Sequence, residues 1–477
     1  MNSLVQSPQR LVERSRWWAF GAVCLGFLLI EIDGTNVNIA LRSIQADLGF
    51  SQLSLIWVVN AYLITFGGFL LIGGRLGDLF GPRRLFLCGI VLFMAASAVC
   101  GATHSRAWLI GARAVQGLGS AVVAPIALSF TMSLFSEGPQ RAAAFGIYIF
   151  LQAFGASVGL LLSGLLVSIL NWHWIFLINL PLGAVAYTLC LRLPPDGPRL
   201  MTRNRLDTAG AAAVTVSLTL AVYGVVNAGK VGWSSVQTLT CLAGACASLI
   251  LFLYIEAGVS NPVIPLSLFK RRNLVIANAI YLLAAFATTG WYFISALYLQ
   301  MILRYSAEQT GLAFLPFSLT GAALSLGVGR KLVVHLGTKL PVVCGLLIAF
   351  TGIISFARVP LHGDFADDIL PGMLLVGLGN GAIGIPTLLV ATKGAAPSES
   401  GFVSGIMTTA AMIGGALGLA ILLSAASACT NKLLAAGASL SVALNDGYHV
   451  AFFAAAGLYA VAIFLSATFL PKEERAS

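Results

Sequence analysis

The feature of this sequence that most constrains its fold is a series of uninterrupted apolar runs, each about twenty residues long. An α-helix of that length rises by about 30 Å, which is enough to span the hydrocarbon core of a bilayer. An outer-membrane β-barrel would instead show alternating segments of about ten residues. The chain is 58% hydrophobic and 9% charged, whereas soluble domains are about 45–50% apolar and about 25% charged. The sequence therefore predicts an all-α polytopic membrane protein and excludes soluble enzymes, secreted disulfide scaffolds and disordered proteins.

The apolar runs fall into three sets along the chain. Six precede a polar stretch at 192–207, two follow it, and six more come after a basic loop that holds Lys270, Arg271 and Arg272. We therefore expect fourteen transmembrane helices, near 17–41, 53–73, 84–102, 107–132, 143–166, 172–191, 208–227, 237–256, 274–302, 311–329, 340–357, 369–391, 402–426 and 449–470.

The first six and the last six expected helices carry matching segments. GLGSAVVAP begins at Gly117 and GLGNGAIGIP at Gly377, while AFGASVG begins at Ala153 and MIGGALG at Met412. The two offsets, 260 and 259 residues, are nearly equal and indicate an internal repeat. We expect an N-terminal six-helix bundle at 1–191, cytoplasmic loops with two additional helices at 192–273, and a C-terminal six-helix bundle at 274–477. A transporter whose binding site lies between two halves requires this arrangement.

The distribution of lysine and arginine predicts the orientation. The N-terminal segment, every second loop after it and the C-terminal segment together hold 20 of the 27 lysines and arginines. The loops on the opposite side of the membrane hold six, and Arg113 lies inside a helix. Basic residues are retained in the cytoplasm, so both termini are expected there. The first apolar stretch is too long for a signal-peptide core and is expected to remain as a membrane helix. No N-x-S/T sequon occurs, which fits a bacterial cytoplasmic membrane.

Several other functions are disfavoured by the distribution of reactive residues. The net charge of +10 does not indicate a nucleic-acid partner, because the basic residues are scattered between apolar runs. The eight cysteines form no C-x-x-C pair, and the five histidines are dispersed near helix ends. We therefore expect no metal, no cofactor and no enzymatic activity.

Three charged residues lie within the expected membrane helices away from their ends, namely Glu31, Asp33 and Arg113. By the rise of an α-helix, Asp33 and Arg113 lie roughly 12 Å and 10 Å below the outer surface, so an ion pair is possible. A charge at mid-membrane is costly, and each of the three is a candidate for proton coupling. A static salt bridge that fixes helix packing is the alternative for the pair. Glu31 points away from Asp33 and is either part of a polar cavity or a neutral acid bonded to a neighbour.

Uncharged polar and aromatic side chains predict a central substrate cavity. On the expected helix at 274–302, Trp291, Ser295 and Tyr298 share one face. Interhelical packing is the alternative for any single residue. The full set of cavity candidates is Asn36, Asn60, Tyr62, Gln116, Tyr148, Gln152, Trp291, Ser295 and Tyr298.

The loop GRLGDLFGPRR, from Gly74 to Arg84, resembles the cytoplasmic signature of the major facilitator superfamily. The segments IDGTNVNIAL, WVVNAYL, LIGARAVQGLGSA and NWHWIFLINLPLG, with the helix count, narrow the resemblance to the fourteen-helix drug:proton antiporter family. The resemblance implies a major facilitator fold with two extra central helices. It also implies that Asp33 is the acid of the first-helix motif, that Arg113 takes part in proton coupling, and that the loop is a conformational switch. The switch residues would be Gly74, Asp78, Gly81, Arg83 and Arg84.

The sequence departs from the family pattern at three places. The fifth helix normally carries Gly-Pro, but here Leu160 follows Gly159, so the expected kink is weaker. Gly155, Gly159 and Gly164 remain candidates for a hinge or a packing face. Arg42 replaces a usual proline, and His173 stands where the family often has arginine. His173 is either a group that titrates near neutrality or a hydrogen-bonding residue at the interface.

These features predict a monomeric, proton-driven exporter of small lipophilic drugs, dyes or antibiotics, cationic or not, that works by alternating access. Its partners are the small-molecule substrate, protons and the lipid bilayer, with no nucleic acid. Substrate and proton would compete for Asp33. The alternative is a dedicated exporter or facilitator of one metabolite, such as a self-made antibiotic, a siderophore or an amino acid. A non-transporting scaffold or receptor lacks support, because no loop is long enough for a soluble domain.

Overall fold

The computed structural model describes residues 8–135, 139–192, 208–259, 270–324, 335–393 and 400–470, and these residues form helices and connecting turns without a strand. The first helices, called here the N-terminal group, are α1 (Pro8–Leu48), α2 (Gln52–Phe80), α3 (Pro82–Ala102), α4 (Arg106–Leu134), α5 (Pro139–Ile169), α6 (Trp174–Leu177) and α7 (Asn179–Cys190). An inserted pair follows, α8 (Thr208–Val231) and α9 (Val236–Gly258). The C-terminal group comprises α10 (Arg272–Leu297), η2 (Tyr298–Ile302), α11 (Ala307–Ala313), α12 (Leu315–Ala323), α14 (Lys339–Phe356), η4 (Phe365–Ile369), α15 (Leu370–Thr392), α16 (Ser400–Ala435) and α17 (Leu440–Phe469).

The polytopic all-α prediction is confirmed. Within the described residues, ten helices are long and apolar enough to cross a membrane, and the shorter apolar helices are Val158–Ile169, Trp174–Cys190 and Ala212–Ala228. The expected span at 311–329 runs into residues 325–334, which lie outside the described part. The count of fourteen therefore stays a prediction.

One expected helix, at 172–191, is divided into α6 and α7. The division falls at Ile178, directly before the helix that contains Pro181. Proline lacks a backbone N–H and cannot donate to the carbonyl of the residue four positions earlier. The next backbone N–H, that of Leu182, donates to the Ile178 carbonyl oxygen in a hydrogen bond that is long, at 3.5 Å. The first turn of α7 is therefore weakly bonded to the chain before it.

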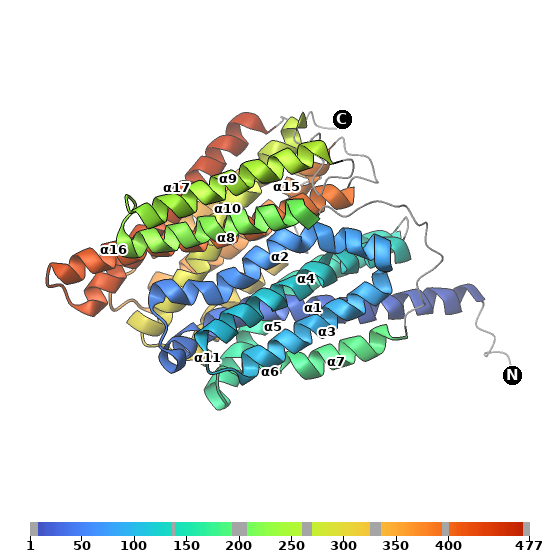
Figure 1. Ribbon diagram of the computed structural model, residues 1–477, viewed down its shortest axis with the longest axis horizontal. Helices are drawn as coiled ribbons and strands as arrows, with labels where there is room; N and C mark the ends of the chain where they lie inside the picture. The colour runs from blue at the N-terminus through green and yellow to red at the C-terminus, as the bar shows by residue number, and fades with distance from the viewer. Residues whose placement is uncertain are drawn as a thin grey trace.

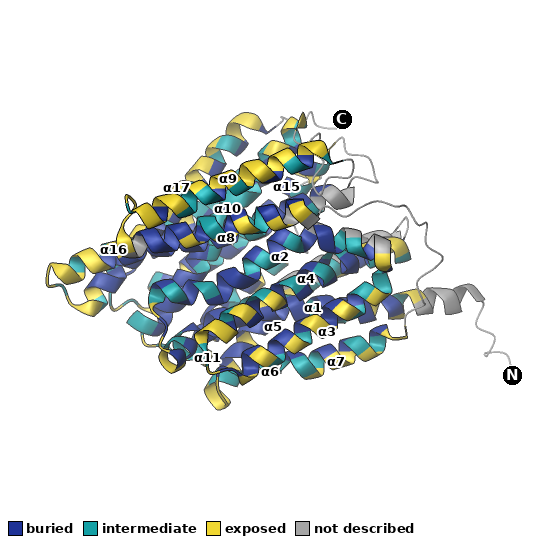
Figure 2. Cartoon of the chain, in the orientation of Figure 1, coloured by how far each residue is buried: buried dark blue, intermediate teal, exposed yellow. Residues whose placement is uncertain are grey.

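The helices form one elongated bundle in which helices far apart in the sequence, such as α2 and α4 or α10 and α16, pack together. The N-terminal group occupies one side and the C-terminal group the other, while α8 packs against α2 and α16 and carries α9 on its other side (Figure 1). Buried residues fill the interior, and exposed residues follow the outward faces, as on α9 and α17 (Figure 2). Several of these exposed residues are large and apolar, including Ile250, Tyr254 and Phe464. Apolar outward faces are what a bilayer environment requires.

Side chains of the two groups meet at the end of the bundle that holds the α1–α2 turn. We call this the outer end, as the basic-residue distribution predicts. Arg42 NH1 donates to the Gln300 carbonyl oxygen at 2.8 Å, and Gln300 Nε2 donates to the Ile39 carbonyl oxygen at 2.9 Å. Gln52 Nε2 donates to the Tyr448 hydroxyl at 3.2 Å. The N-terminal and C-terminal groups are thus hydrogen-bonded to each other at the outer end.

Candidate functional site

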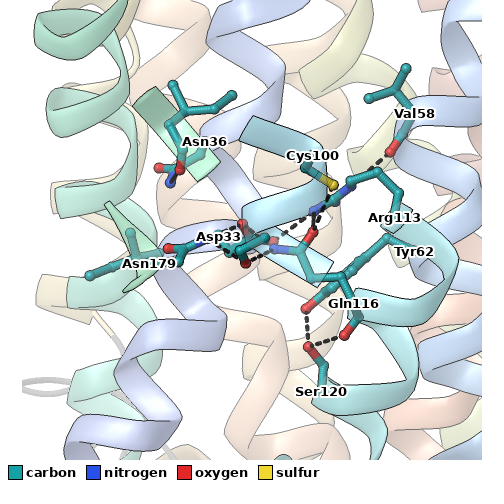
Figure 3. A network of polar contacts seen from close by, with 12 residues as sticks. Asp33, Asn36, Val58, Tyr62, Cys100, Arg113, Gln116, Ser120 and Asn179 are labelled. Carbon is teal, nitrogen blue, oxygen red and sulfur yellow. Dashed lines mark hydrogen bonds and ion pairs between the residues drawn. The ribbon is translucent and has the colours of Figure 1, made fainter. Parts of the chain in front are cut away.

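An ion pair lies inside the N-terminal group. Arg113 NH1 of α4 is 2.7 Å from Asp33 Oδ2 of α1, and the two side chains are 1% and 0% exposed (Figure 3). The ion pair that the similar membrane depths of Asp33 and Arg113 allowed is therefore present in the structure. A buried carboxylate and guanidinium stabilise each other only when their remaining hydrogen-bonding atoms are also satisfied.

Two amide side chains complete the hydrogen bonding of Asp33. Gln116 Nε2 and Asn179 Nδ2 donate to Asp33 Oδ1 at 2.9 Å and 2.7 Å. Gln116 also donates to Ser97 Oγ at 2.8 Å and accepts from Arg113 NH1 at 2.7 Å. Asp33 is therefore held by side chains from α4 and α7, and Ser97 links α3 to the same network.

The other side of the Arg113 guanidinium faces α2. Arg113 Nε donates to the Val58 carbonyl oxygen at 3.0 Å, and the guanidinium carbon lies 4.4 Å from the centre of the Tyr62 ring. The Tyr62 hydroxyl donates to Ser120 Oγ at 2.9 Å (Figure 3). A guanidinium over an aromatic face gains further electrostatic stabilisation. The arginine is thus satisfied by α1, α2 and α4 together.

Every member of this network belongs to the N-terminal group. Asn179 and Ser97 are functional candidates that the sequence alone did not single out. Asn179 is the second asparagine of the motif NWHWIFLINLPLG, and its place in this motif is the sequence feature that could have pointed to it. The network is buried, so the Asp33 carboxylate does not face the C-terminal group.

Glu31 occupies a different position from Asp33. It is half-buried, and a Cβ at Gly155 of α5 would lie 2.7 Å from the Glu31 Cβ. The charge of Glu31 acts over a longer range on the hydroxyls of Tyr148 of α5 and Tyr281 of α10. Glu31 thus lies where α1 packs against α5, within electrostatic range of one tyrosine of the C-terminal group.

The three candidate glycines of α5 allow close helix packing. A Cβ at Gly159 would overlap Thr35 Oγ1 of α1, and a Cβ at Gly164 would lie 2.9 Å from the Ala307 carbonyl oxygen of α11. Gly155 and Gly159 thus bring α5 against α1, whereas Gly164 brings α5 against the C-terminal group.

The predicted switch loop, Gly74 to Arg84, is mostly helical, since it comprises the end of α2, Gly81 and the start of α3. Gly81 has φ 96° and its N–H donates to the Gly77 carbonyl oxygen at 3.0 Å, a backbone conformation that favours glycine. Arg83 Nε donates to the Cys190 carbonyl oxygen at 3.5 Å, and Arg83 NH2 donates to that of Leu191. The loop therefore places a cation at the C-terminus of α7. Gly74 packs against Pro125 and Arg84 is exposed, whereas the Asp78 side chain lies outside the described part.

The predicted cavity residues are mostly buried in this conformation. Asn60 Nδ2 donates to the Ala416 carbonyl oxygen at 3.1 Å and so joins α2 to α16. Trp291 packs among aromatic rings, and the Tyr298 hydroxyl donates to the Pro360 carbonyl oxygen at 2.8 Å. Tyr62 and Gln116 belong to the Arg113 network, and Asn36 and Ser295 are buried. The Tyr148 ring stacks on the Phe27 ring. The side chain of Gln152 lies outside the described part of the structure.

Comparison with known proteins adds the family context. The model of the Major Facilitator Superfamily matches residues 23–419. Cephamycin export protein CmcT of Amycolatopsis lactamdurans is 36% identical over 403 residues, which cover 84% of this chain and 83% of that protein. Puromycin resistance protein pur8 of Streptomyces alboniger is 36% identical over 434 residues, which cover 91% of this chain and 86% of that protein. The human organic anion transporter MFSD10 (TETRAN) has a similar fold, with a TM-score of 0.63 at 17% identity over 97% of this chain and 100% of that one.

Proposed function

This chain belongs to the Major Facilitator Superfamily, and we propose that it exports small antibiotic-like compounds across a bacterial cytoplasmic membrane in exchange for protons. It is a transporter and not an enzyme. The relatives named for cephamycin export and puromycin resistance support efflux as the direction of transport.

We infer a transporter of two six-helix halves, 1–191 and 274–477, with α8 and α9 as two extra helices and both termini in the cytoplasm. The packing of the N-terminal and C-terminal groups on opposite sides of the bundle supports this division. The protein acts as a monomer, with the substrate path between the halves. The hydrogen bonds at the outer end correspond to a conformation closed to the outside.

The observation that carries proton coupling is the buried Asp33 network. Asp33 accepts hydrogen bonds from Arg113, Gln116 and Asn179. A proton on the carboxylate would cancel the charge and weaken these bonds. Because they join α1 to α4 and α7, protonation would change how α1 packs in its own half. An inward proton gradient would then bias the equilibrium between conformations.

The burial of Asp33 separates proton binding from substrate binding. Asp33 is 0% exposed, so a substrate does not reach it in this conformation. We therefore assign the proton to Asp33, and we assign the contact with a cationic substrate to Glu31. The assignment is supported by the electrostatic influence of Glu31 on Tyr148 and Tyr281, whose rings suit lipophilic cations.

The test is proton movement across proteoliposomes that hold a pH gradient, read with a fluorescent probe while dyes and antibiotics are added one at a time. Asp33→Asn should abolish substrate-triggered proton movement for every compound. Glu31→Gln should abolish it for lipophilic cations but keep it for neutral compounds. Asp367→Asn, which changes an exposed acid of η4, is the matched control and should behave as wild type.

The folded state of each variant is checked by gel filtration before transport is measured. Asp33→Glu keeps an acid at the site and should retain partial coupling if the carboxylate carries the proton. Full coupling in folded Asp33→Asn would refute the assignment of the proton to Asp33.

A second candidate is the dedicated exporter of one metabolite. The relatives named for cephamycin and puromycin, single antibiotics, favour this narrower function. Activity with one compound of a broad substrate panel would support it, whereas activity with many unrelated compounds would support multidrug export.

A further inference from the structure

Three side chains from three different connections meet at the outer end of the N-terminal group. Asp47 lies in the last turn of α1, His104 in the turn between α3 and α4, and His173 in the turn between α5 and α6. One ligand atom from each, a carboxylate oxygen or an imidazole nitrogen, lies within 4.8 Å of the other two. The three residues are 57 to 126 positions apart in the sequence, so no spacing motif predicts that they meet.

The cluster is held in place by Trp172. Trp172 Nε1 donates to Asp47 Oδ2 at 2.9 Å, which fixes the carboxylate. The same indole stacks on the His173 ring, with centroids 3.7 Å apart and an angle of 24° between the planes. The rings of His104 and His173 are 5.2 Å apart. Hydrogen bonds of this kind orient the ligands in metal sites and keep them from rotating away.

One atom of the cluster lacks a partner. The Nε2 atom of His173 is buried and has no hydrogen-bonding partner within the described residues. A neutral imidazole carries one N–H and one nitrogen lone pair, and a lone pair on this Nε2 atom would be available to a metal ion.

Two imidazoles and one carboxylate are ligands that divalent transition metals bind, zinc in particular. Bonds of about 2.0–2.2 Å in a tetrahedral site bring ligand atoms to roughly 3.4 Å from one another. The present separations, which are at most 4.8 Å, must therefore shorten by up to about 1.4 Å. His104 is exposed, so rotation of its side chain can bring its ligand atom closer to the other two while Asp47 stays bonded to Trp172.

We propose that Asp47, His104 and His173 form a zinc-binding site at the outer end, with three protein ligands and a fourth position open to water. The site lies away from the Asp33 network. Bound zinc would tie the end of α1 to the α3–α4 and α5–α6 turns, within a single half of the transporter.

Cobalt(II) and zinc binding to the purified full-length protein, prepared without a polyhistidine tag, test this proposal. Cobalt should give the visible absorption of a low-symmetry nitrogen and oxygen site at one equivalent, and zinc should displace it. Asp47→Asn and His104→Asn should each weaken zinc binding at least tenfold. His362→Asn changes an exposed histidine outside the cluster and should bind zinc as wild type does.

His104→Cys keeps the proposal testable if the asparagine variants are unstable. It replaces an imidazole by a thiolate, so it should still bind cobalt and should add an intense sulfur-to-metal absorption band. Equal zinc affinity in wild type, Asp47→Asn and His104→Asn would overturn the site, as would the absence of the sulfur band in folded His104→Cys.

Discussion

A carboxylate is tolerated at residue 33 because three donors surround it. A charge at mid-membrane costs on the order of 3 kcal/mol on insertion scales. The Asp33 carboxylate offsets this with bonds from Arg113, Gln116 and Asn179, and Arg113 is satisfied in turn by Val58 and Tyr62. Removing one of the two charges therefore leaves the other buried without a counter-charge, whereas removing both does not.

A double-mutant cycle tests this interdependence. Asp33→Asn leaves the Arg113 guanidinium buried and unpaired, and we expect it to lower the free energy of unfolding by about 3–5 kcal/mol. Arg113→Met should cost a similar amount. The double variant should be more stable than either single variant, because no uncompensated charge remains. Thermal unfolding in detergent measures all four proteins, and additive losses would contradict the argument.

The sequence identified this pair but not all of its partners. The rise of a helix places Asp33 and Arg113 at similar depths, so their contact could be predicted from position alone. Asn179 could not be placed in this way, since its orientation depends on the break between α6 and α7. The position of Glu31 within electrostatic range of Tyr281 depends on how α10 packs, which a single sequence does not determine.

At the scale of helices, the internal repeat seen in the sequence has a structural counterpart. A Cβ at Gly117 of α4 would overlap Thr65 Oγ1 of α2, and a Cβ at Gly377 of α15 would overlap Thr320 Oγ1 of α12. Both helices also carry an interior proline, Pro125 in α4 and Pro386 in α15. The segments GLGSAVVAP and GLGNGAIGIP thus make the same kind of close helix contact in each group. Small residues that let backbones approach are the usual means of joining membrane helices.

Substitution of these glycines should separate the paired helices. At Gly117 a methyl group would meet both Thr65 Oγ1 and the Tyr62 carbonyl oxygen, and the backbone atom cannot rotate away. We expect Gly117→Ala to destabilise the protein by about 1–3 kcal/mol through overpacking. Gly111→Ala, in the same helix but with nothing within 4 Å, is the matched control and should be neutral or slightly stabilising. Equal unfolding temperatures for the two variants in detergent would contradict this.

At the scale of the whole molecule, the hydrogen bonds at the outer end connect the N-terminal group to the C-terminal group. The Arg42 side chain donates to the Gln300 carbonyl oxygen of η2, and the Gln300 side chain donates to the Ile39 carbonyl oxygen of α1. These two bonds fix the end of α1 against η2. The first-helix motif that this sequence resembles has proline where Arg42 stands, and proline has no side chain that could donate such a bond. This departure from the family pattern therefore supplies a specific contact that holds the outer end closed.

Removal of the Arg42 side chain should shift the transporter towards outward-open conformations. A charge-assisted hydrogen bond contributes about 1.5–3 kcal/mol, and partial exposure places this one at about 1 kcal/mol, or roughly a fivefold change in population. We expect Arg42→Ala to raise hydrogen–deuterium exchange at the end of α1 and in η2, while exchange around Asp33 stays unchanged. Arg358→Ala, which changes an exposed arginine between α14 and η4, should leave exchange at both places as in wild type. If Arg42→Ala exchanges no faster than Arg358→Ala at the outer end, this contact does not hold the two groups together, and the closed end must depend on Gln52 and Tyr448 instead.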